Sequence, residues 1–173
     1  LVAQLLDLSK LESGVVPLNR QRFGVKPLLE QTVREANLHA PPTVQIEVVA
    51  DGALEADADP ERVHQVIANL VENAVRHSPE NGVVKVAAYE HEGGVRIEVT
   101  DQGPGIPAGE ENRVFERFYR ADVARARSEG GSGLGLAIAR WIVDMHGGTI
   151  SAAGAEPAGC RMVVTLPVDT EAA

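Results

Sequence analysis

The order of apolar patterns along the chain predicts an α/β fold, a two-layer sandwich in which helices cover a β-sheet. Three observations support this prediction. Short segments alternate apolar and polar residues, as half-buried strands do. Longer segments between them carry apolar residues at helical spacing, which forms one apolar face on a helix. Glycine, proline and aspartate residues separate the two kinds of segment and so mark the turns.

Four segments have the helical pattern, and in chain order they are 1–12, 27–40, 60–77 and 132–146. The first places Leu1, Leu5 and Leu8 on one stripe. A helix of this length is marginal in isolation, so the stripe needs a partner. The third begins with a strong signal, because Asp59 is a favoured N-cap and Pro60 is a favoured first helical residue. The last is apolar nearly all round and is expected to be buried.

Seven shorter segments have strand character, and in chain order they are 16–23, 43–50, 53–57, 83–91, 95–101, 149–153 and 160–167. The first is expected to be a short edge strand despite Pro17. The fourth and fifth form a hairpin joined at Gly93-Gly94. Residues 106–130 are the longest stretch without firm structure, and loops of this length are usually functional or disordered.

Composition narrows the class of protein. A chain of 173 residues suits one well-packed domain, and its net charge of −9 argues against general nucleic-acid binding. The arginines between Arg113 and Arg127 nevertheless make one region locally basic. Cys160 is the only cysteine, which excludes an internal disulfide or a cysteine-cluster metal site and fits a reducing cytosol. No apolar run approaches the roughly 20 residues needed to cross a bilayer. The chain opens mid-pattern without a methionine, so we expect it to be part of a longer protein.

A polar stripe borders the apolar face of the third predicted helix. Asn69, Asn73 and Arg76 lie at i, i+4 and i+7, and we expect such a border to face a cleft. Amide oxygens are hard neutral ligands, and Mg²⁺ takes oxygen ligands while it keeps phosphates and waters in its shell. By itself, however, this spacing fits a solvated polar face more often than a metal site.

Asp101 ends the strand predicted at 95–101, and Gly103 and Gly105 follow it. A carboxylate at a strand end can cap the next turn or accept a hydrogen bond from a ligand, and the sequence leaves both open. The two glycines let the backbone come close to a ring without a Cβ in the way. A second glycine run, Gly130–Gly135, opens the last helix, where free N–H groups attract phosphate. It is neither a Walker loop nor a dinucleotide fingerprint, because no lysine precedes Ser or Thr and no buried strand precedes the glycines.

Four separated segments, taken together and in this order, resemble the N, first-glycine, F and second-glycine boxes of sensor histidine kinases. They are Asn69–Ala74, Asp101–Gly105, Phe115–Arg120 and Gly130–Leu136. The resemblance spans residues 1–168 and implies the Bergerat fold, a mixed and mostly antiparallel sheet packed on one side by about three helices. It divides the chain into the end of a dimerisation helix with its hinge, a catalytic ATP-binding domain, an ATP lid within that domain and a C-terminal tail, at residues 1–14, 15–168, 106–130 and 169–173. For the first segment, a helix packed on its own domain is the alternative.

The resemblance also implies a site for MgATP. Asn73 would be the principal magnesium ligand with Asn69 in support, Arg76 would contact phosphate and His77 would lie against the base. Asp101 would accept a hydrogen bond from the exocyclic amine of adenine, whereas guanine presents an oxygen there. For His77 a surface position at the helix end is the alternative. The nucleotide-binding residues that the resemblance implies are Asn69, Asn73, Arg76, His77, Asp101, Gly103, Gly105, Ile106, Arg117, Arg120, Gly131, Ser132, Gly133, Leu134, Gly135 and Leu136.

The segment 106–130 would be a lid that orders over MgATP, with Arg117 and Arg120 near the phosphates. Its three aromatic residues also fit a small satellite core, and they are Phe115, Phe118 and Tyr119.

As a relative of this family the protein would be a histidine kinase, which donates the γ-phosphate of ATP to a histidine for relay to an aspartate of a response regulator. None of the five histidines has the sequence context of an acceptor, so we expect the acceptor upstream of Leu1 and no catalytic residue in this chain. The implied partners are its own dimerisation domain, a response regulator and a second copy in a homodimer. Neither nucleic acid nor membrane contact is expected of this segment, which would be the cytoplasmic part of a membrane-anchored sensor.

Two other functions stay open. ATP-hydrolysing relatives of the gyrase, Hsp90 and mismatch-repair types carry a glutamate where this chain has Asn69, and an amide cannot act as a general base. Glu72 lies about 60° away from the polar stripe on a helix of 3.6 residues per turn, which favours phosphoryl transfer over hydrolysis. The other alternative is an interaction module that has lost nucleotide binding.

Overall fold

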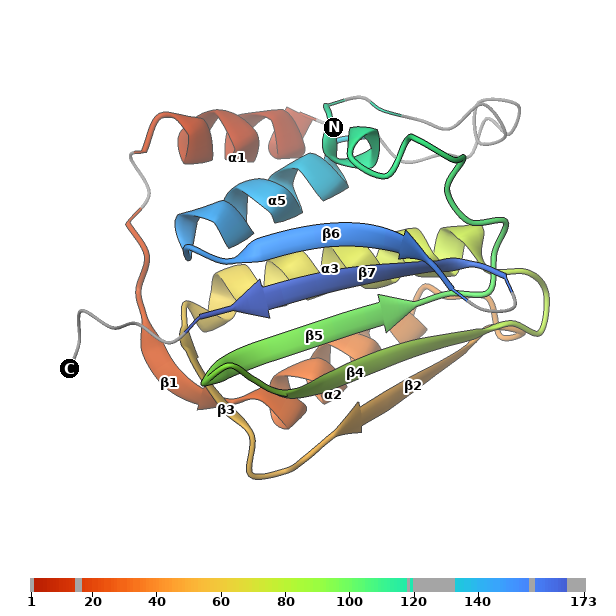
Figure 1. Ribbon diagram of the computed structural model, residues 1–173, viewed down its shortest axis with the longest axis horizontal. Helices are drawn as coiled ribbons and strands as arrows, with labels where there is room; N and C mark the ends of the chain where they lie inside the picture. Colours follow the sequence, from red (N-terminus) through yellow and green to blue (C-terminus); the bar gives the residue numbers. More distant parts are fainter. Residues whose placement is uncertain (1, 15–16, 118, 120–132, 156–157, 168–173) are drawn as a thin grey trace.

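The computed structural model describes residues 2–14, 17–117, 119, 133–155 and 158–167, and the structural statements below concern these residues. Its helices are α1 (Val2–Glu12), α2 (Val25–Asn37), α3 (Pro60–His77) and α5 (Gly135–Met145), with one 3₁₀ turn, η1 (Arg113–Phe115). Its strands are β1 (Gln21–Gly24), β2 (Gln45–Ala50), β3 (Glu55–Ala58), β4 (Val83–His91), β5 (Gly94–Thr100), β6 (Thr149–Gly154) and β7 (Cys160–Leu166). Figure 1 shows these elements coloured along the chain.

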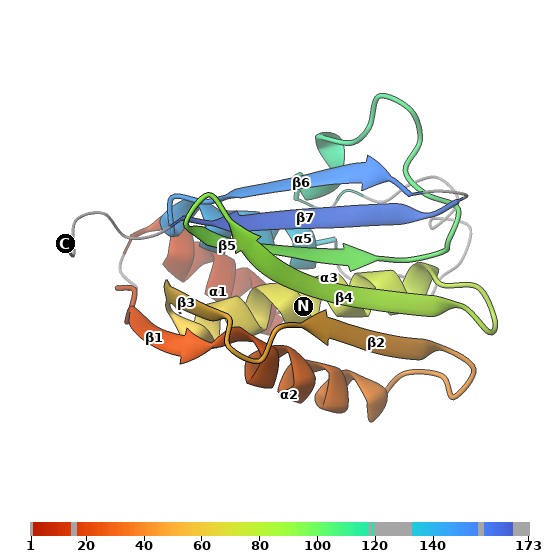
Figure 2. The same cartoon turned by 60° about the horizontal axis from the view of Figure 1, so that its bottom comes forward.

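Five strands form one sheet in the order β2-β4-β5-β7-β6. β2 and β4 run parallel, and the other neighbouring pairs of this sheet are antiparallel. The helices α2, α3 and α5 lie on one face of the sheet, as Figure 2 shows from a second direction. The predicted two-layer α/β sandwich with a mixed, mostly antiparallel sheet is therefore confirmed.

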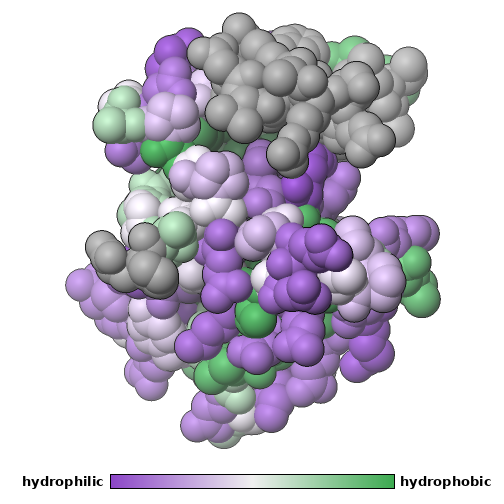
Figure 3. Space-filling view, turned by 90° about the vertical axis from the view of Figure 1, so that its right-hand side faces the viewer, coloured by the Kyte–Doolittle hydropathy of each residue, from purple (hydrophilic) through white to green (hydrophobic). Residues whose placement is uncertain are grey.

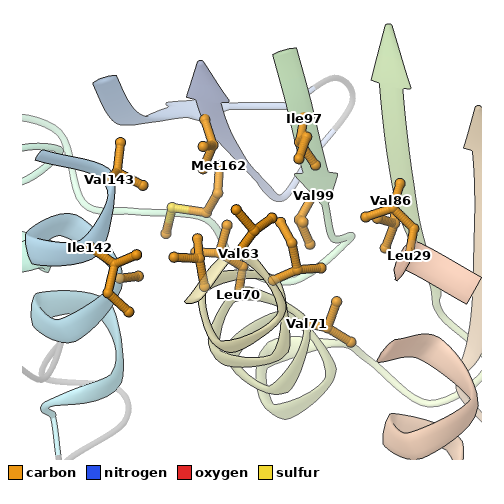
Figure 4. Packing of buried hydrophobic residues seen from close by; sticks show 14 of the residues in the cluster. Leu29, Val63, Leu70, Val71, Val86, Ile97, Val99, Ile142, Val143 and Met162 are labelled. Atoms are coloured by element: carbon orange, nitrogen blue, oxygen red, sulfur yellow. The ribbon is translucent and has the colours of Figure 1, made fainter. Parts of the chain in front are cut away.

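α3 lies at the centre of the helical layer, between α2 and α5 (Figure 4). Its apolar stripe is buried at six positions, namely Val63, Val66, Ile67, Leu70, Val71 and Ala74. The stripe packs in one core with inward-facing strand residues such as Val86, Ile97 and Val99. Complete burial of one such side chain contributes about 1.5–3 kcal/mol. The stripe therefore holds α3 firmly on the sheet, and the polar border of the helix is held in place with it.

The start of α3 and the end of α5 share a buried polar network. Asp59 caps α3, because its Oδ1 accepts from two backbone N–H groups of the first turn at 3.1 and 3.3 Å. Its Oδ2 accepts from the N–H of Asn19 at 3.1 Å. The N–H of Asp59 donates to Nε2 of His146 at 3.1 Å, and Nδ1 of His146 lies 2.8 Å from the carbonyl oxygen of Ile142. This arrangement requires the neutral ring with its proton on Nδ1, and burial lowers the pKa of His146.

Three elements differ from the prediction, and one of them is α2, which was expected at 27–40 and lies at Val25–Asn37. The strand expected at 16–23 is β1, which pairs with β3 in a separate two-stranded sheet and does not extend the main sheet. Local alternation could not distinguish these cases, because strand pairing depends on contacts distant in sequence. The last helix starts at Gly135 rather than at 132. Within the described ranges, no helix combines the length and the apolar character that a membrane span requires.

Candidate functional site

The C-terminal end of α3 and the end of β5 lie at one edge of the sheet, at the right of Figure 1, and α5 has its start at the end of the helix that is nearer to this edge. Figure 3 looks onto this edge, where the described surface is mostly hydrophilic with small, separate hydrophobic patches. The topology explains this convergence, because β5 runs toward the edge while its antiparallel neighbour β7 starts from it. Residues that are far apart in the sequence are therefore neighbours here.

Asn69 joins α3 to the start of α5. Its Nδ2 donates a hydrogen bond to the carbonyl oxygen of Gly135 at 3.0 Å. A Cβ on Gly135 would lie 3.7 Å from Cγ of Asn69, which is an ordinary van der Waals distance. Neither Oδ1 of Asn69 nor the amide group of Asn73 has a hydrogen-bond partner among the described residues. Both side chains are half-buried, and polar atoms in that position without a protein partner suit a ligand or water.

The donor set at this edge restricts the metal that could bind. Within the described part of the chain, no group of three or more His, Cys, Asp or Glu side chains could hold a metal ion. A cation on the polar stripe would therefore be held by the amide oxygens of Asn73 and Asn69 together with oxygens of a ligand and of water. This set fits Mg²⁺, which takes few protein ligands and keeps phosphate and water oxygens. It does not fit a metal that needs imidazole or thiolate ligands.

The structure places Arg76 and His77, at the end of α3, with partners other than those expected. Arg76 pairs with Glu72 one turn earlier, with 3.3 Å between Nη2 and Oε1. Contact of Arg76 with a phosphate would require it to leave this pair, so that role stays a prediction. The carbonyl oxygen of His77 lies against Gly103, where any Cβ would overlap it. The backbone of His77 thus contacts the first glycine box, while contact of its ring with a base stays a prediction.

Asp101 is 4% exposed, and among the described residues only one of its carboxylate oxygens accepts hydrogen bonds. Oδ1 accepts from the N–H of Gly103 at 2.9 Å and from the N–H of Cys160 at 3.2 Å. No described residue donates to Oδ2. Burial raises the pKa of Asp101, and the two N–H donors and the nearby His77 oppose that rise. The turn-capping contact that the sequence left open is therefore present, and it leaves a second acceptor oxygen for a ligand.

Close packing of the backbone shapes the first glycine box. Gly103 has no room for a Cβ beside the carbonyl oxygen of His77, and Gly105 has φ of +81°, a conformation that favours glycine. Packing thus requires glycine at 103 and the backbone conformation favours it at 105, while the close approach of a ring to these glycines stays a prediction. Ile106 is partly buried against the hydrophobic core, so its side chain contributes to the fold.

The structure describes four residues of the second glycine box, namely Gly133, Leu134, Gly135 and Leu136, while Gly131 and Ser132 lie outside the described residues. Gly133 has φ of +77°. Leu134 is fully buried and Leu136 packs partly against the core, so both leucine side chains serve the fold. A phosphate at this position would meet backbone N–H groups instead. The first turn of α5 supplies such groups, because the initial N–H groups of a helix lack partners within it.

Residues 106–117 and Tyr119 of the predicted lid are described, and Arg120 lies outside the described residues. Phe115 is 5% exposed and belongs to the main core, whereas the sequence suggested a small satellite core. The hydroxyl of Tyr119 donates to Glu110 at 2.6 Å, and its ring packs partly against the core. The described part of the segment is therefore anchored to the domain at Phe115 and Tyr119.

α1 packs along α5 (Figure 1), and its Leu8 is buried, with 3% of its surface exposed. Leu5 and Leu6 remain exposed, by 41% and 57%. Arg117 forms an ion pair with Glu12 of this helix, and its expected position near the phosphates stays a prediction. The N-terminal helix therefore contacts its own domain and also keeps two exposed leucines, so its role as the end of a dimerisation helix stays a prediction.

Two contributors to the site were missed by the sequence reasoning. The sequence predicts Cys160 only as the first residue of a strand, yet its backbone N–H donates to Asp101. No local pattern indicates this, because any residue except proline can supply a backbone donor. Gly159 lies next to it, and the only available signal was a glycine at the start of a strand, which often marks a close backbone approach.

Comparison with known sequences relates this chain to ATPase domains and to sensor histidine kinases. A family model described as histidine kinase-, DNA gyrase B- and HSP90-like ATPase matches residues 58–170. Sensor histidine kinase WalK of Bacillus subtilis (strain 168) is 37% identical over 174 residues, which cover 99% of this chain and 28% of WalK. Sensor-like histidine kinase SenX3 of Mycobacterium tuberculosis (strain ATCC 25618 / H37Rv) is 33% identical over 173 residues, which cover 99% of this chain and 42% of SenX3. The chain thus spans less than half the length of these curated relatives.

Solved structures lead to the same group of proteins. The mycobacterial sensor histidine kinase MprB superposes with a TM-score of 0.74 at 30% identity, over 86% of this chain and 97% of the MprB chain. Full-length ShkA in complex with AMPPNP superposes with a TM-score of 0.81 at 29% identity, over 96% of this chain and 35% of the ShkA chain. The sequence relatives WalK and SenX3 and the structural neighbour MprB are thus all named as sensor histidine kinases.

Proposed function

Since the chain belongs to the histidine kinase-, DNA gyrase B- and HSP90-like ATPase family, in its sensor histidine kinase branch, we propose that it binds MgATP and donates the γ-phosphate to a histidine of a dimerisation domain. Relay of the phosphate to an aspartate of a response regulator is part of the same proposal. So are homodimerisation of the whole protein and a cytoplasmic position of this domain within a membrane-anchored sensor.

The observation that carries the proposal is that only one of the two carboxylate oxygens of Asp101 accepts a hydrogen bond from the described residues. Two backbone donors hold its Oδ1, while its Oδ2 has no donor among the described residues. A fixed and largely desolvated acceptor selects a ligand that carries an amine at the matching position. Adenine has such an amine, and guanine presents an oxygen there, which would leave the buried carboxylate unpaired at considerable cost. The geometry therefore favours an adenine nucleotide.

The polar stripe of α3 supports the phosphate end of the proposal. The hydrogen bond between Asn69 and Gly135 joins the proposed cation ligands to the start of α5. Asn73 would hold the cation with its unpaired amide, and the first N–H groups of α5 would hold phosphate oxygens. Bound Mg²⁺ supplies charge neutralisation of the phosphates, while these groups orient them.

Transfer to a histidine, rather than hydrolysis, is supported by the position of the carboxylates on α3. The side-chain amide nitrogen of Asn69 donates a hydrogen bond to the carbonyl oxygen of Gly135, and an amide cannot take a proton from water. Glu72 has a side chain that is 70% exposed, and its carboxylate pairs with the guanidinium of Arg76, so it is not a free base beside Asn69. An acid–base group for water activation is thus missing from the described part of this stripe.

The position of α1 supports the proposed division of the chain. Its exposed leucines, Leu5 and Leu6, form an apolar surface. If α1 is the end of a longer dimerisation helix, the partner helices of the dimer would cover this surface. We propose residues 1–14 as the end of that helix with its hinge, 15–168 as the catalytic domain and 106–130 as the lid. The proposed tail, 169–173, lies outside the described residues.

Isothermal titration of this chain with a non-hydrolysable ATP analogue, in the presence and absence of Mg²⁺, tests the proposal. We expect Mg²⁺-dependent binding, with weaker binding of the corresponding GTP analogue. A chain that folds but binds neither nucleotide would contradict the proposal and support an interaction module.

A second experiment separates transfer from hydrolysis. Incubation with γ-labelled ATP of a longer natural chain, which includes the segment preceding residue 1, should label a histidine. The chain described here should release phosphate only at background rate. Release well above background would favour the hydrolytic alternative.

A further inference from the structure

The start of β7 approaches Asp101 more closely than a side chain would allow. Gly159, which precedes β7 and lies outside the four boxes, has φ of +114°, a conformation that L side chains rarely adopt. A Cβ at this position would overlap the carbonyl oxygen of Asp101 and lie 2.8 Å from its carbonyl carbon. Both the backbone conformation and the available space therefore require glycine here.

This close approach brings the next residue within hydrogen-bond distance of Asp101 on two sides. The N–H of Asp101 donates to the carbonyl oxygen of Cys160 at 2.9 Å. The N–H of Cys160 donates to Oδ1 of Asp101 at 3.2 Å. Gly105 adds a third segment, since its Cβ would lie 3.0 Å from the carbonyl oxygen of Gly159. The end of β5, the first glycine box and the start of β7 thus pack backbone to backbone around one carboxylate.

We propose that Gly159 is a positioning residue for adenine recognition by Asp101. It does not contact the nucleotide itself. By admitting the N–H of Cys160, it holds Oδ1 of Asp101 from a second direction and leaves Oδ2 for the base. This inference rests on the proposed function of Asp101 as the adenine acceptor.

The physical argument is one of preorganisation. With two backbone donors the carboxylate is fixed before the ligand arrives, and binding then costs little ordering. A side chain at position 159 would push the start of β7 away and remove the donor of Cys160. The Asp101 carboxylate would keep only the N–H of Gly103, so it could rotate and would lose part of its preference for an amine.

Gly147 and Gly154 provide control positions, because neither has the close backbone contact that Gly159 makes with Asp101. Gly147 also has a positive φ, of +69°, but the nearest atom to its Cβ position is Cγ of Pro167 at 4.0 Å. Gly154 lies at the end of β6, and no atom lies within 4 Å of its Cβ position. Gly147→Ala therefore reproduces the backbone strain alone, and Gly154→Ala reproduces an added methyl group near the same turn.

The experiment compares Gly159→Ala with these two controls by titration with the ATP and GTP analogues. We expect Gly159→Ala to weaken binding of the ATP analogue by about tenfold, the typical value of a hydrogen bond to a charged group. The ratio of ATP to GTP affinity should fall as well, while both controls keep the ratio of the parent. A pH series adds a further readout. Because the lost N–H opposed the rise of the pKa of Asp101, binding in the variant should disappear at a higher pH than in the parent.

A folded Gly159→Ala protein with the parent's affinity ratio and pH midpoint would overturn the inference. If the variant does not fold, an NMR pH titration of the parent tests whether the N–H of Cys160 is bonded to the carboxylate of Asp101. The amides of Cys160 and Gly103 should both titrate with the carboxyl group of Asp101, and a Cys160 amide that does not follow it would overturn the inference. If the parent binds neither analogue, the proposed function fails, whereas the NMR result still tests the contact by itself.

Discussion

Buried polar groups near the two ends of α3 differ in how fully they are paired. Near the start of the helix, Asp59 is 5% exposed and accepts on both oxygens, and His146 uses both ring nitrogens. Near its end, Asp101 is 4% exposed and accepts on one oxygen, and the amide of Asn73 has no partner among the described residues. Buried polar groups in proteins are normally paired. A complete network therefore indicates a structural role, and an incomplete one indicates a place for a ligand.

Asn73→Ala should produce the largest effect, because it removes the amide that we propose as the principal magnesium ligand. We expect the Mg²⁺-dependent affinity for a non-hydrolysable ATP analogue to fall on the order of 100-fold, the upper end of losses caused by changes around metal ligands. Isothermal titration with and without Mg²⁺ measures this fall. Asn19→Ala is the matched control, since it makes the same substitution at an exposed side chain near the other end of α3 and should leave the dependence on Mg²⁺ unchanged. Equal binding by Asn73→Ala and the parent would show that the metal assignment is wrong.

Asp101→Asn tests the unused oxygen directly. The amide keeps an acceptor for the N–H groups of Gly103 and Cys160 and places a donor where Oδ2 stands. We expect binding of the ATP analogue to weaken by about tenfold or more. The GTP analogue should gain relative to it, because guanine presents an acceptor oxygen at that position. An unchanged ratio of the two affinities would mean that Oδ2 does not contact the base.

Asp59→Ala should have the opposite profile, with lower stability and an unchanged nucleotide preference. The variant loses the cap of α3 and the acceptor for the N–H of Asn19. We expect the free energy of unfolding to fall by about 1–2 kcal/mol, as for other lost N-caps. Urea unfolding measures this value, and nucleotide titration supplies the control. A changed ATP to GTP ratio would mean that the two ends of α3 cannot be treated separately.

Acidification should have the smallest effects, and they should differ in sign between the two ends. Burial lowers the pKa of His146, so the stability contributed by its neutral ring is present above about pH 6.5, the ordinary pKa of histidine, and is lost as the pH falls below it. Burial raises the pKa of Asp101, so its charged form is destabilising, and protonation near its ordinary pKa of 3.8 and somewhat above relieves that cost.

Urea unfolding at a series of pH values checks the first of these effects. The free energy of unfolding should decrease between pH 7 and pH 5.5 in the parent, and His146→Gln should show a flatter profile from a lower starting value. A parent profile that matches the variant would contradict the assigned role of His146. Nucleotide binding should weaken only at lower pH, where Asp101 takes up a proton.

The range of each interaction explains which features the sequence could predict. The bounds of α3 follow from Asp59, Pro60 and the Ser78-Pro79 pair, all of which lie at the helix itself, and the structure has these bounds. The stripe of Asn69 and Asn73 likewise follows from helical geometry alone. The pair of Arg76 with Glu72 could also have been expected at i, i+4, although a phosphate was preferred as its partner.

Contacts between distant segments could not be predicted in this way. Cys160 and Asp101 are 59 residues apart, and Asn69 and Gly135 are 66 residues apart. Arg117 and Glu12 come from a loop and the first helix, and β1 pairs with β3 outside the main sheet. None of these pairs has a signature in the residues around it.

Periodicity, caps and glycine runs are local properties, so the chain alone was enough to place its helices and most strands and to indicate residues suited to MgATP. The three-dimensional fold established which oxygen of Asp101 has no hydrogen-bond donor among the described residues and which backbone segments enclose that carboxylate. It also established which carboxylates pair with Arg76 and Arg117. The physical reason is that the sheet order brings together the end of β5 and the start of β7, and burial then decides which polar atoms remain unpaired.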